Sequence, residues 1–132
     1  MSHFSTIKTK LKSTEHLLEA LDVLGHDPEQ EQQVMVVSDR EHAKGHPNVK
    51  VDIVAANKTI GFRWNESSQS YELVTDLQTW NQPIPVERFL SKLSQQYALK
   101  NIEASVKDEG FTITDKVVAA DGSIEVVCSR WE

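Results

Sequence analysis

The chain has 132 residues and a formal net charge of −6, with 39% hydrophobic and 26% charged residues. This composition suits one domain over residues 1–132 and excludes a disordered chain. The acidic balance argues against binding to nucleic acid or to anionic membranes. No apolar run approaches the roughly 20 residues that cross a bilayer, and no signal peptide is recognisable, so we expect a cytoplasmic protein without membrane insertion.

The first quarter of the chain predicts a strand followed by a helix. Residues 2–11 mix β-branched and polar side chains, which is typical of a strand. Lysines at positions 8, 10 and 12 favour an edge strand, because edge lysines discourage aggregation between strands. In the following segment Ser13 or Thr14 can cap a helix, leucines recur at helical spacing, and Gly25 can end it.

The middle of the chain predicts short strands and a hairpin. The run 33–37 is apolar, and residues 49–55 alternate between apolar and polar side chains, so we expect a strand in each. Residues 60–64 and 71–77 alternate on either side of a polar turn, which predicts a hairpin. This pattern places Trp64 and Tyr71 on the apolar face, and Glu72 and Asp76 on the opposite, solvated face.

The last third predicts a long helix and a closing hairpin. The helical segment has Pro85 at its first position, its apolar stripe shifts in phase near residues 97–100, and Gly110 ends it. The shift indicates a bend, a break or a rotation of the buried face. Asp121 and Gly122 suit a two-residue type I′ turn, which would pair Asp115 with Cys128.

These elements together predict an α+β fold. We expect a largely antiparallel sheet of six or seven strands, with two helices packed on one face. The single cysteine, Cys128, excludes an intramolecular disulfide, and its position within a strand favours a structural role.

No motif in the sequence identifies a catalytic centre. Glycines never cluster, so neither a P-loop nor a dinucleotide-binding motif is present, and no cofactor is indicated. His42 and His46 have the spacing of metal ligands on a helix, with Asp39 nearby. Gly45 and Pro47 argue against a helix there, which favours a polar loop over a metal site.

Two further groups of residues are candidates for binding. Arg63, Glu72 and Asp76 could bind a small molecule between the sheet and the long helix, although carboxylates on a strand are more often simply solvated. Trp80 stands at a strand-to-helix corner before Asn81 and Gln82. It can cover the edge of the core or serve as an interface anchor.

Four blocks carry a resemblance to a known family: "MSHFSTIKT", "IGFRWN…YELVTDLQTW", "FL…QQYAL" and "ADGSIEVVCSRW". The chain resembles the hypothetical chloroplast reading frame thirty-five family, a domain of unknown function, over nearly its whole length apart from residues 26–48. The family carries an Arg-Gly-Tyr type element before the strand that begins here at Val49, and this chain has "DREHAKGHPN" instead.

The resemblance implies a photosynthetic setting but no catalytic residues. Such proteins occur in cyanobacteria, in algal plastids and in cyanophages, so the expected location is the cytoplasm, the plastid stroma or the cytoplasm of a phage host. The family's association with genes for ferredoxins and AAA-type ATPases points to an accessory role.

Two functions remain open from the sequence. The first is an accessory protein without enzymatic activity that binds a partner protein through Trp80, Asn81, Gln82 and the loop containing Asp39, His42 and His46. The second is a small-molecule binder or minor enzyme that uses Arg63, Glu72 and Asp76. The sequence predicts neither the partner nor the oligomeric state.

Overall fold

The computed structural model describes residues 4–30, 34–36, 49–80, 82–119 and 123–130. Two α-helices, a short 3-10 helix and eight strands lie within these ranges. The strands are β1 (Phe4–Lys8), β2 (Val34–Val36), β3 (Val49–Val51), β4 (Ile53–Ala55), β5 (Ile60–Asn65), β6 (Ser70–Asp76), β7 (Phe111–Val118) and β8 (Ile124–Arg130). The helices are α1 (Thr14–Val23), η1 (Leu77–Thr79) and α2 (Val86–Asp108).

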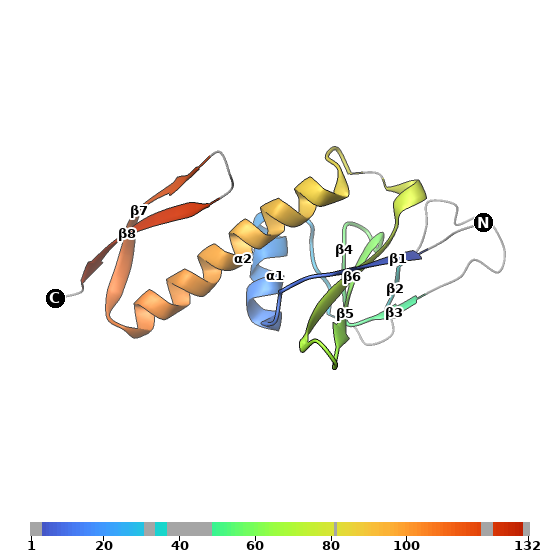
Figure 1. Ribbon diagram of the computed structural model, residues 1–132, viewed down its shortest axis with the longest axis horizontal. Coiled ribbons are helices and arrows are strands. Elements are labelled where there is room, and N and C mark those ends of the chain that lie inside the picture. Colours follow the sequence, from blue (N-terminus) through green and yellow to red (C-terminus); the bar gives the residue numbers. More distant parts are fainter. Residues whose placement is uncertain (1–3, 31–33, 37–48, 81, 120–122, 131–132) are drawn as a thin grey trace.

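The described strands form one four-stranded sheet and two separate pairs. The sheet has the order β1-β6-β5-β4, and β2 pairs with β3 and β7 with β8. Every pairing is antiparallel, so the expected α+β class is confirmed. The strands do not join into one large sheet, because α2 carries β7 and β8 to the opposite end of the molecule (Figure 1).

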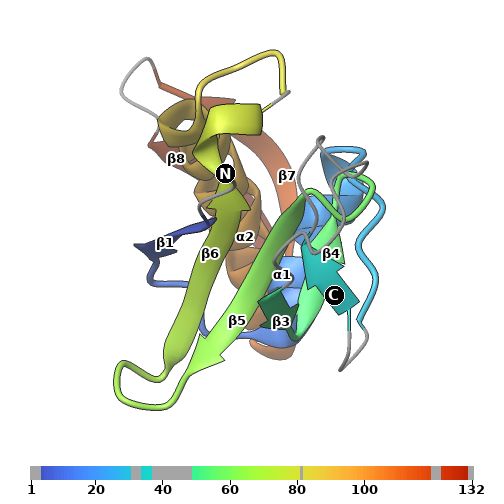
Figure 2. The same cartoon turned by 90° about the vertical axis from the view of Figure 1, so that its right-hand side faces the viewer.

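The main core lies between the four-stranded sheet and the two α-helices. Figure 2 shows α1 and α2 behind the sheet, as the sequence predicts. This cluster consists of apolar side chains from β4, β5, β6, α1 and α2, with Leu11 before α1: Leu11, Leu17, Ala20, Leu21, Ile53, Ala55, Ile60, Phe62, Tyr71, Leu73, Val86, Phe89 and Leu93. The predicted hairpin is confirmed, and Trp64 is paired with Tyr71 across it.

Local signals set the ends of α1. The Ser13 side chain accepts a hydrogen bond from the backbone N–H of His16 at 3.3 Å, as expected of an N-cap. Gly25 follows the helix with φ +78°, a conformation that glycine adopts without steric cost. Leucine spacing and capping therefore predict this helix correctly.

The other face of the sheet carries a second, smaller apolar cluster. Val51, Val54 and Val74 are buried there, and Phe4 and Val49 pack against them. β1 is an edge strand, as its lysines predict, and Lys8 is exposed.

Helix α2 is uninterrupted, although the sequence also allowed a break near residue 97. Its first half packs on the body through Val86, Phe89 and Leu93. The Tyr97 hydroxyl accepts hydrogen bonds from the backbone N–H groups of Lys12 and Ser13 at 3.0 and 2.7 Å. The phase shift therefore reflects a change of packing partner, since the second half of α2 contacts β7 and β8.

The register of the last hairpin differs from the prediction by one residue. Asp115 pairs with Val127, not with Cys128, and Val117 pairs with Glu125. A register shift also occurs between Ile113 and Asp115. The prediction is wrong because it assumed a two-residue turn, whereas five residues separate the paired Val118 and Ile124.

Candidate partner-binding site

The chain beyond Leu99 forms a projection that we call the C-terminal arm, defined as residues 99–119 and 123–130. The end of α2 extends away from the body, and β7 and β8 lie along it (Figure 1). None of the hairpin side chains that the structure describes is buried. A two-stranded hairpin is marginally stable unless it packs on another element, so α2 is the support of this one.

The two faces of the hairpin differ in chemistry. Residues directly opposed across the pair share a face, and so do residues two apart along a strand. The register therefore places Val117, Val127, Asp115 and Glu125 on one face. The two valines are 56% and 57% exposed and lie diagonally across the strand pair, so they form a small apolar patch. We call this the outer face of the arm.

The inner face of the hairpin is half-covered by α2. Phe111, Ile113 and Cys128 are intermediate in exposure on this side. The guanidinium carbon of Arg130 lies 5.3 Å from the centre of the Phe111 ring, which is a cation–π contact across the pair. The inner face therefore presents a few partly buried apolar side chains towards α2, and the Arg130 guanidinium lies at the edge of this group.

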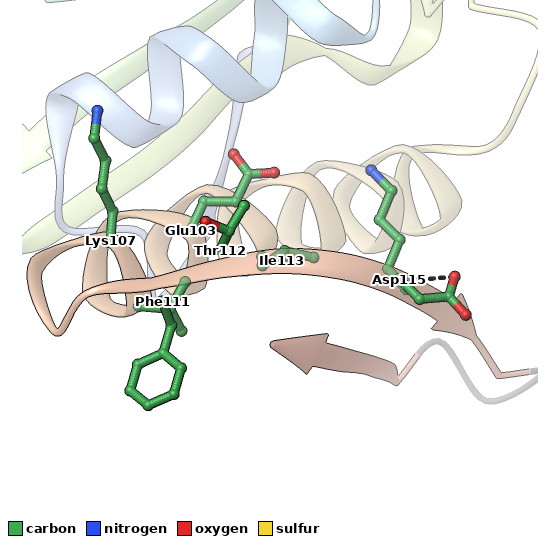
Figure 3. A pocket seen from close by; sticks show the side chains of 8 residues that line it. Glu103, Lys107, Phe111, Thr112, Ile113 and Asp115 are labelled. Carbon is green, nitrogen blue, oxygen red and sulfur yellow. Dashed lines mark hydrogen bonds between the residues drawn. The ribbon is translucent and has the colours of Figure 1, made fainter. Parts of the chain in front are cut away.

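A groove of about 500 Å³ separates the end of α2 from β7 (Figure 3). Three apolar and four charged side chains line it together with Thr112: Val106, Phe111, Ile113, Glu103, Lys107, Asp115 and Lys116. Two of the charged side chains are acidic and two are basic, so their formal charges cancel. Such a groove suits a mixed protein surface rather than a simple anion or cation.

The structure assigns Trp80 to the edge of the core. Its indole N–H donates to the carbonyl oxygen of Ile84 at 2.7 Å, and its ring meets the Phe89 ring edge-on at 5.5 Å. Gln82 follows and is half-buried. The other residues predicted for this surface, Asn81 and the segment containing Asp39, His42 and His46, lie outside the described residues.

Arg63, Glu72 and Asp76 do not line the space between the sheet and α2. Glu72 and Asp76 alternate with Tyr71 and Leu73, which face the helices, so both carboxylates lie on the opposite face. Arg63 is directly opposite Glu72 in the β5–β6 register, and its Nη2 is 3.5 Å from Glu72 Oε2.

The prediction that the two carboxylates are solvated is wrong. Glu72 is only 8% exposed and Asp76 only 3%, on the face that also carries the second apolar cluster. Glu72 also accepts a hydrogen bond from Asn65 Nδ2 at 2.5 Å. Asp76 caps η1 by accepting from the Gln78 backbone N–H at 3.0 Å. These contacts give both carboxylates structural roles.

Possible metal ligands do not converge within the described part of the chain. Within it, no group of three or more His, Cys, Asp or Glu side chains is placed to hold a metal ion. Cys128 is half-buried in β8. Among the described helices, none combines the length and apolar character needed to span a bilayer.

Sequence reasoning missed the C-terminal arm as a candidate site. It predicted the long helix and the hairpin, but treated the hairpin as part of a larger sheet. The only available signal was that Glu125 and Val127, two residues apart, share one face of a strand, and this does not reveal whether another element covers that face.

Comparison with known proteins identifies the family. Residues 20–127 match the family described as a protein of unknown function (DUF1257). The chain belongs to this family. Proteins described as uncharacterized protein ycf35 match nearly end to end: that of Pyropia yezoensis is 37% identical over 131 residues, covering 99% of this chain and 98% of the relative.

Further relatives match to a similar extent. The ycf35 protein of Guillardia theta is 38% identical over 136 residues, and that of Cyanophora paradoxa is 34% identical over 142 residues. Each match covers 99% of this chain and 98% of the relative. The resemblance noted from the sequence blocks is thereby confirmed. No solved structure matches the chain.

Proposed function

We propose that this DUF1257 protein is an accessory protein without enzymatic activity that binds a partner protein through the outer face of its C-terminal arm. The observation that carries the proposal is the exposure of Val117 and Val127, at 56% and 57%, on a face of the hairpin that no other described element covers. Contiguous exposed apolar side chains with polar neighbours are characteristic of protein interaction sites.

The charges around the valines define the partner's chemistry. Asp115 and Glu125 lie on the same face, and the chain as a whole carries a net charge of −6. A complementary surface is therefore apolar at its centre and basic around it. We place this partner in the photosynthetic setting implied by the family resemblance.

The surface predicted from the sequence remains a second proposal for protein binding. It comprises Trp80, Asn81, Gln82 and the segment containing Asp39 to His46. The packing of Trp80 on Phe89 favours a supporting role for that side chain over direct contact. Small-molecule binding by Arg63, Glu72 and Asp76 is less well supported, because Arg63 and Glu72 are ion-paired and Asp76 is a helix cap.

Site-specific photo-crosslinking tests the arm. A photoreactive p-benzoylphenylalanine at position 127 should yield a discrete crosslinked partner in cells, and the same residue at exposed Gln69 on the body provides the control. Once the partner is identified, Glu125→Lys should slow association and weaken its dependence on salt. Equal crosslinking from positions 127 and 69 would contradict the proposal.

A further inference from the structure

A small hollow lies beside the loop that follows Trp80, on the body and separate from the C-terminal arm. Its volume is about 190 Å³. Three segments that are distant in sequence form it: the end of α1, the proline-containing loop and the early turns of α2. The lining residues are Leu24, His26, Gln82, Pro83, Ile84, Phe89 and Lys92.

The apolar wall of the hollow is built on the core. Phe89 is 1% exposed, and its ring meets the His26 ring edge-on at 5.1 Å and the Trp80 ring edge-on at 5.5 Å. The Trp80 indole N–H donates to the Ile84 carbonyl at 2.7 Å and so ties the loop to itself, and the contact of the Trp80 ring with Phe89 holds the loop against α2. The hollow is therefore formed before any ligand arrives, which reduces the ordering cost of binding.

The polar groups of the hollow favour an anion. Lys92 contributes an ammonium, Gln82 an amide and His26 an imidazole, and the lining set includes no carboxylate. This contrasts with the hollow beside α1, where Glu19, Asp22 and other acidic residues line the wall. Among the described residues that line the hollow, Lys92 carries the permanent charge, which favours an anion over a cation.

The His26 side chain adds a group that responds to an anion. The His26 backbone is fixed by two hydrogen bonds. Its carbonyl oxygen accepts from the Ala56 backbone N–H at 2.9 Å, and its backbone N–H donates to the Leu21 carbonyl oxygen at 3.0 Å. Burial lowers the pKa of the imidazole, and the nearby Asp27 carboxylate opposes this only partly. An anion bound against the ring would raise that pKa.

We propose that this hollow binds a small monocarboxylate with an apolar body. The carboxylate would lie against Lys92 and Gln82, and the hydrocarbon part against Leu24, Ile84 and Phe89. A hollow of about 190 Å³ suits a short aliphatic or single-ring acid.

Hexanoate is the probe, with hexanamide and hexylamine as neutral and cationic analogues of similar length. Titration into ¹⁵N-labelled full-length protein should give saturable shifts at His26, Gln82 and Lys92 for hexanoate. The affinity for hexanoate should exceed that for either analogue by about threefold or more, the contribution expected of an ion pair with an exposed lysine. The pKa of His26, followed by NMR, should rise in saturating hexanoate.

Two matched variants distinguish binding at the hollow from a general attraction of hexanoate to positive charge. Lys92→Gln should weaken hexanoate binding by about threefold, whereas Arg88→Gln should leave it unchanged, because Arg88 is exposed one turn earlier on α2 and does not line the hollow. Both substitutions remove one positive charge from an exposed position, so neither should affect folding.

Three results would overturn the proposal: no saturable shift at millimolar hexanoate, equal affinity for hexanamide, or an equal effect of the two variants. Val127→Lys on the arm should not affect hexanoate binding, so the monocarboxylate site and the proposed partner surface can fail independently.

Discussion

Replacing Trp80 distinguishes its hydrogen bond from its packing. Trp80→Phe retains a ring against Phe89 but removes the donor to the Ile84 carbonyl at 2.7 Å. A net protein hydrogen bond contributes about 1 kcal/mol, so we expect the free energy of unfolding to fall by that amount. Trp80→Ala also removes the packing.

Trp80→Ala tests the packing of Trp80 more sharply than Trp80→Phe does, because the expected loss of stability is larger. Truncation of a fully buried aromatic side chain costs about 3–5 kcal/mol. Trp80 is only partly buried at the edge of the core, so we expect a loss of about 2–3 kcal/mol. Urea unfolding followed by circular dichroism measures the change, with an unchanged denaturant slope as a check on two-state behaviour.

A nearby exposed residue provides the control. Leu77 is 42% exposed in η1, and Leu77→Ala should change stability by less than about 0.5 kcal/mol. If Trp80→Ala lay within the same range, the reasoning that places Trp80 in the core edge would be refuted. The anchoring of the loop that lines the small hollow would be refuted with it.

Three other changes test separate parts of the structure. Tyr97→Phe removes the acceptor of two backbone N–H groups before α1 and should lower the free energy of unfolding by about 1–2 kcal/mol in urea; no change would mean that water replaces the hydroxyl. Lys58→Gly should raise the thermal midpoint, because Lys58 has φ +66° and relief of about 1–2 kcal/mol of strain exceeds the entropic cost of glycine; a lower midpoint would contradict this. Because the pKa of His26 is lowered in the folded state, the unfolded chain binds a proton at a higher pH than the folded chain does. The free energy of unfolding should therefore fall as the pH drops below 6.5, the ordinary pKa of histidine. His26→Gln should reduce that drop between about pH 7.5 and 5.5, and an identical drop in both proteins would argue against the assignment.

Several features of the fold follow from short stretches of sequence. The cap at Ser13, the glycine at position 25 and the hairpin that pairs Trp64 with Tyr71 each depend on residues within a few positions of one another. Alternation and helical spacing report these contacts because the backbone geometry repeats locally. The edge position of β1 was likewise indicated by Lys8.

The errors arise where distant segments meet. The sequence places Glu72 and Asp76 on the correct face of β6, but their burial depends on side chains from other strands, such as Arg63 beside Glu72. The same limit applies to the last hairpin. Its existence was predicted, whereas its register depended on how many residues its connection leaves unpaired.

The sequence by itself determined the α+β class, the helices and hairpins, and the family membership, because these depend on local periodicity and on residue identity. Only the tertiary structure decided that β7 and β8 stand apart from the main sheet with Val117 and Val127 exposed. It also decided that His26, Gln82 and Lys92 surround one hollow. Whether a side chain is exposed, and whether distant residues meet at one site, depends on how segments pack together, and no local pattern in the chain encodes this.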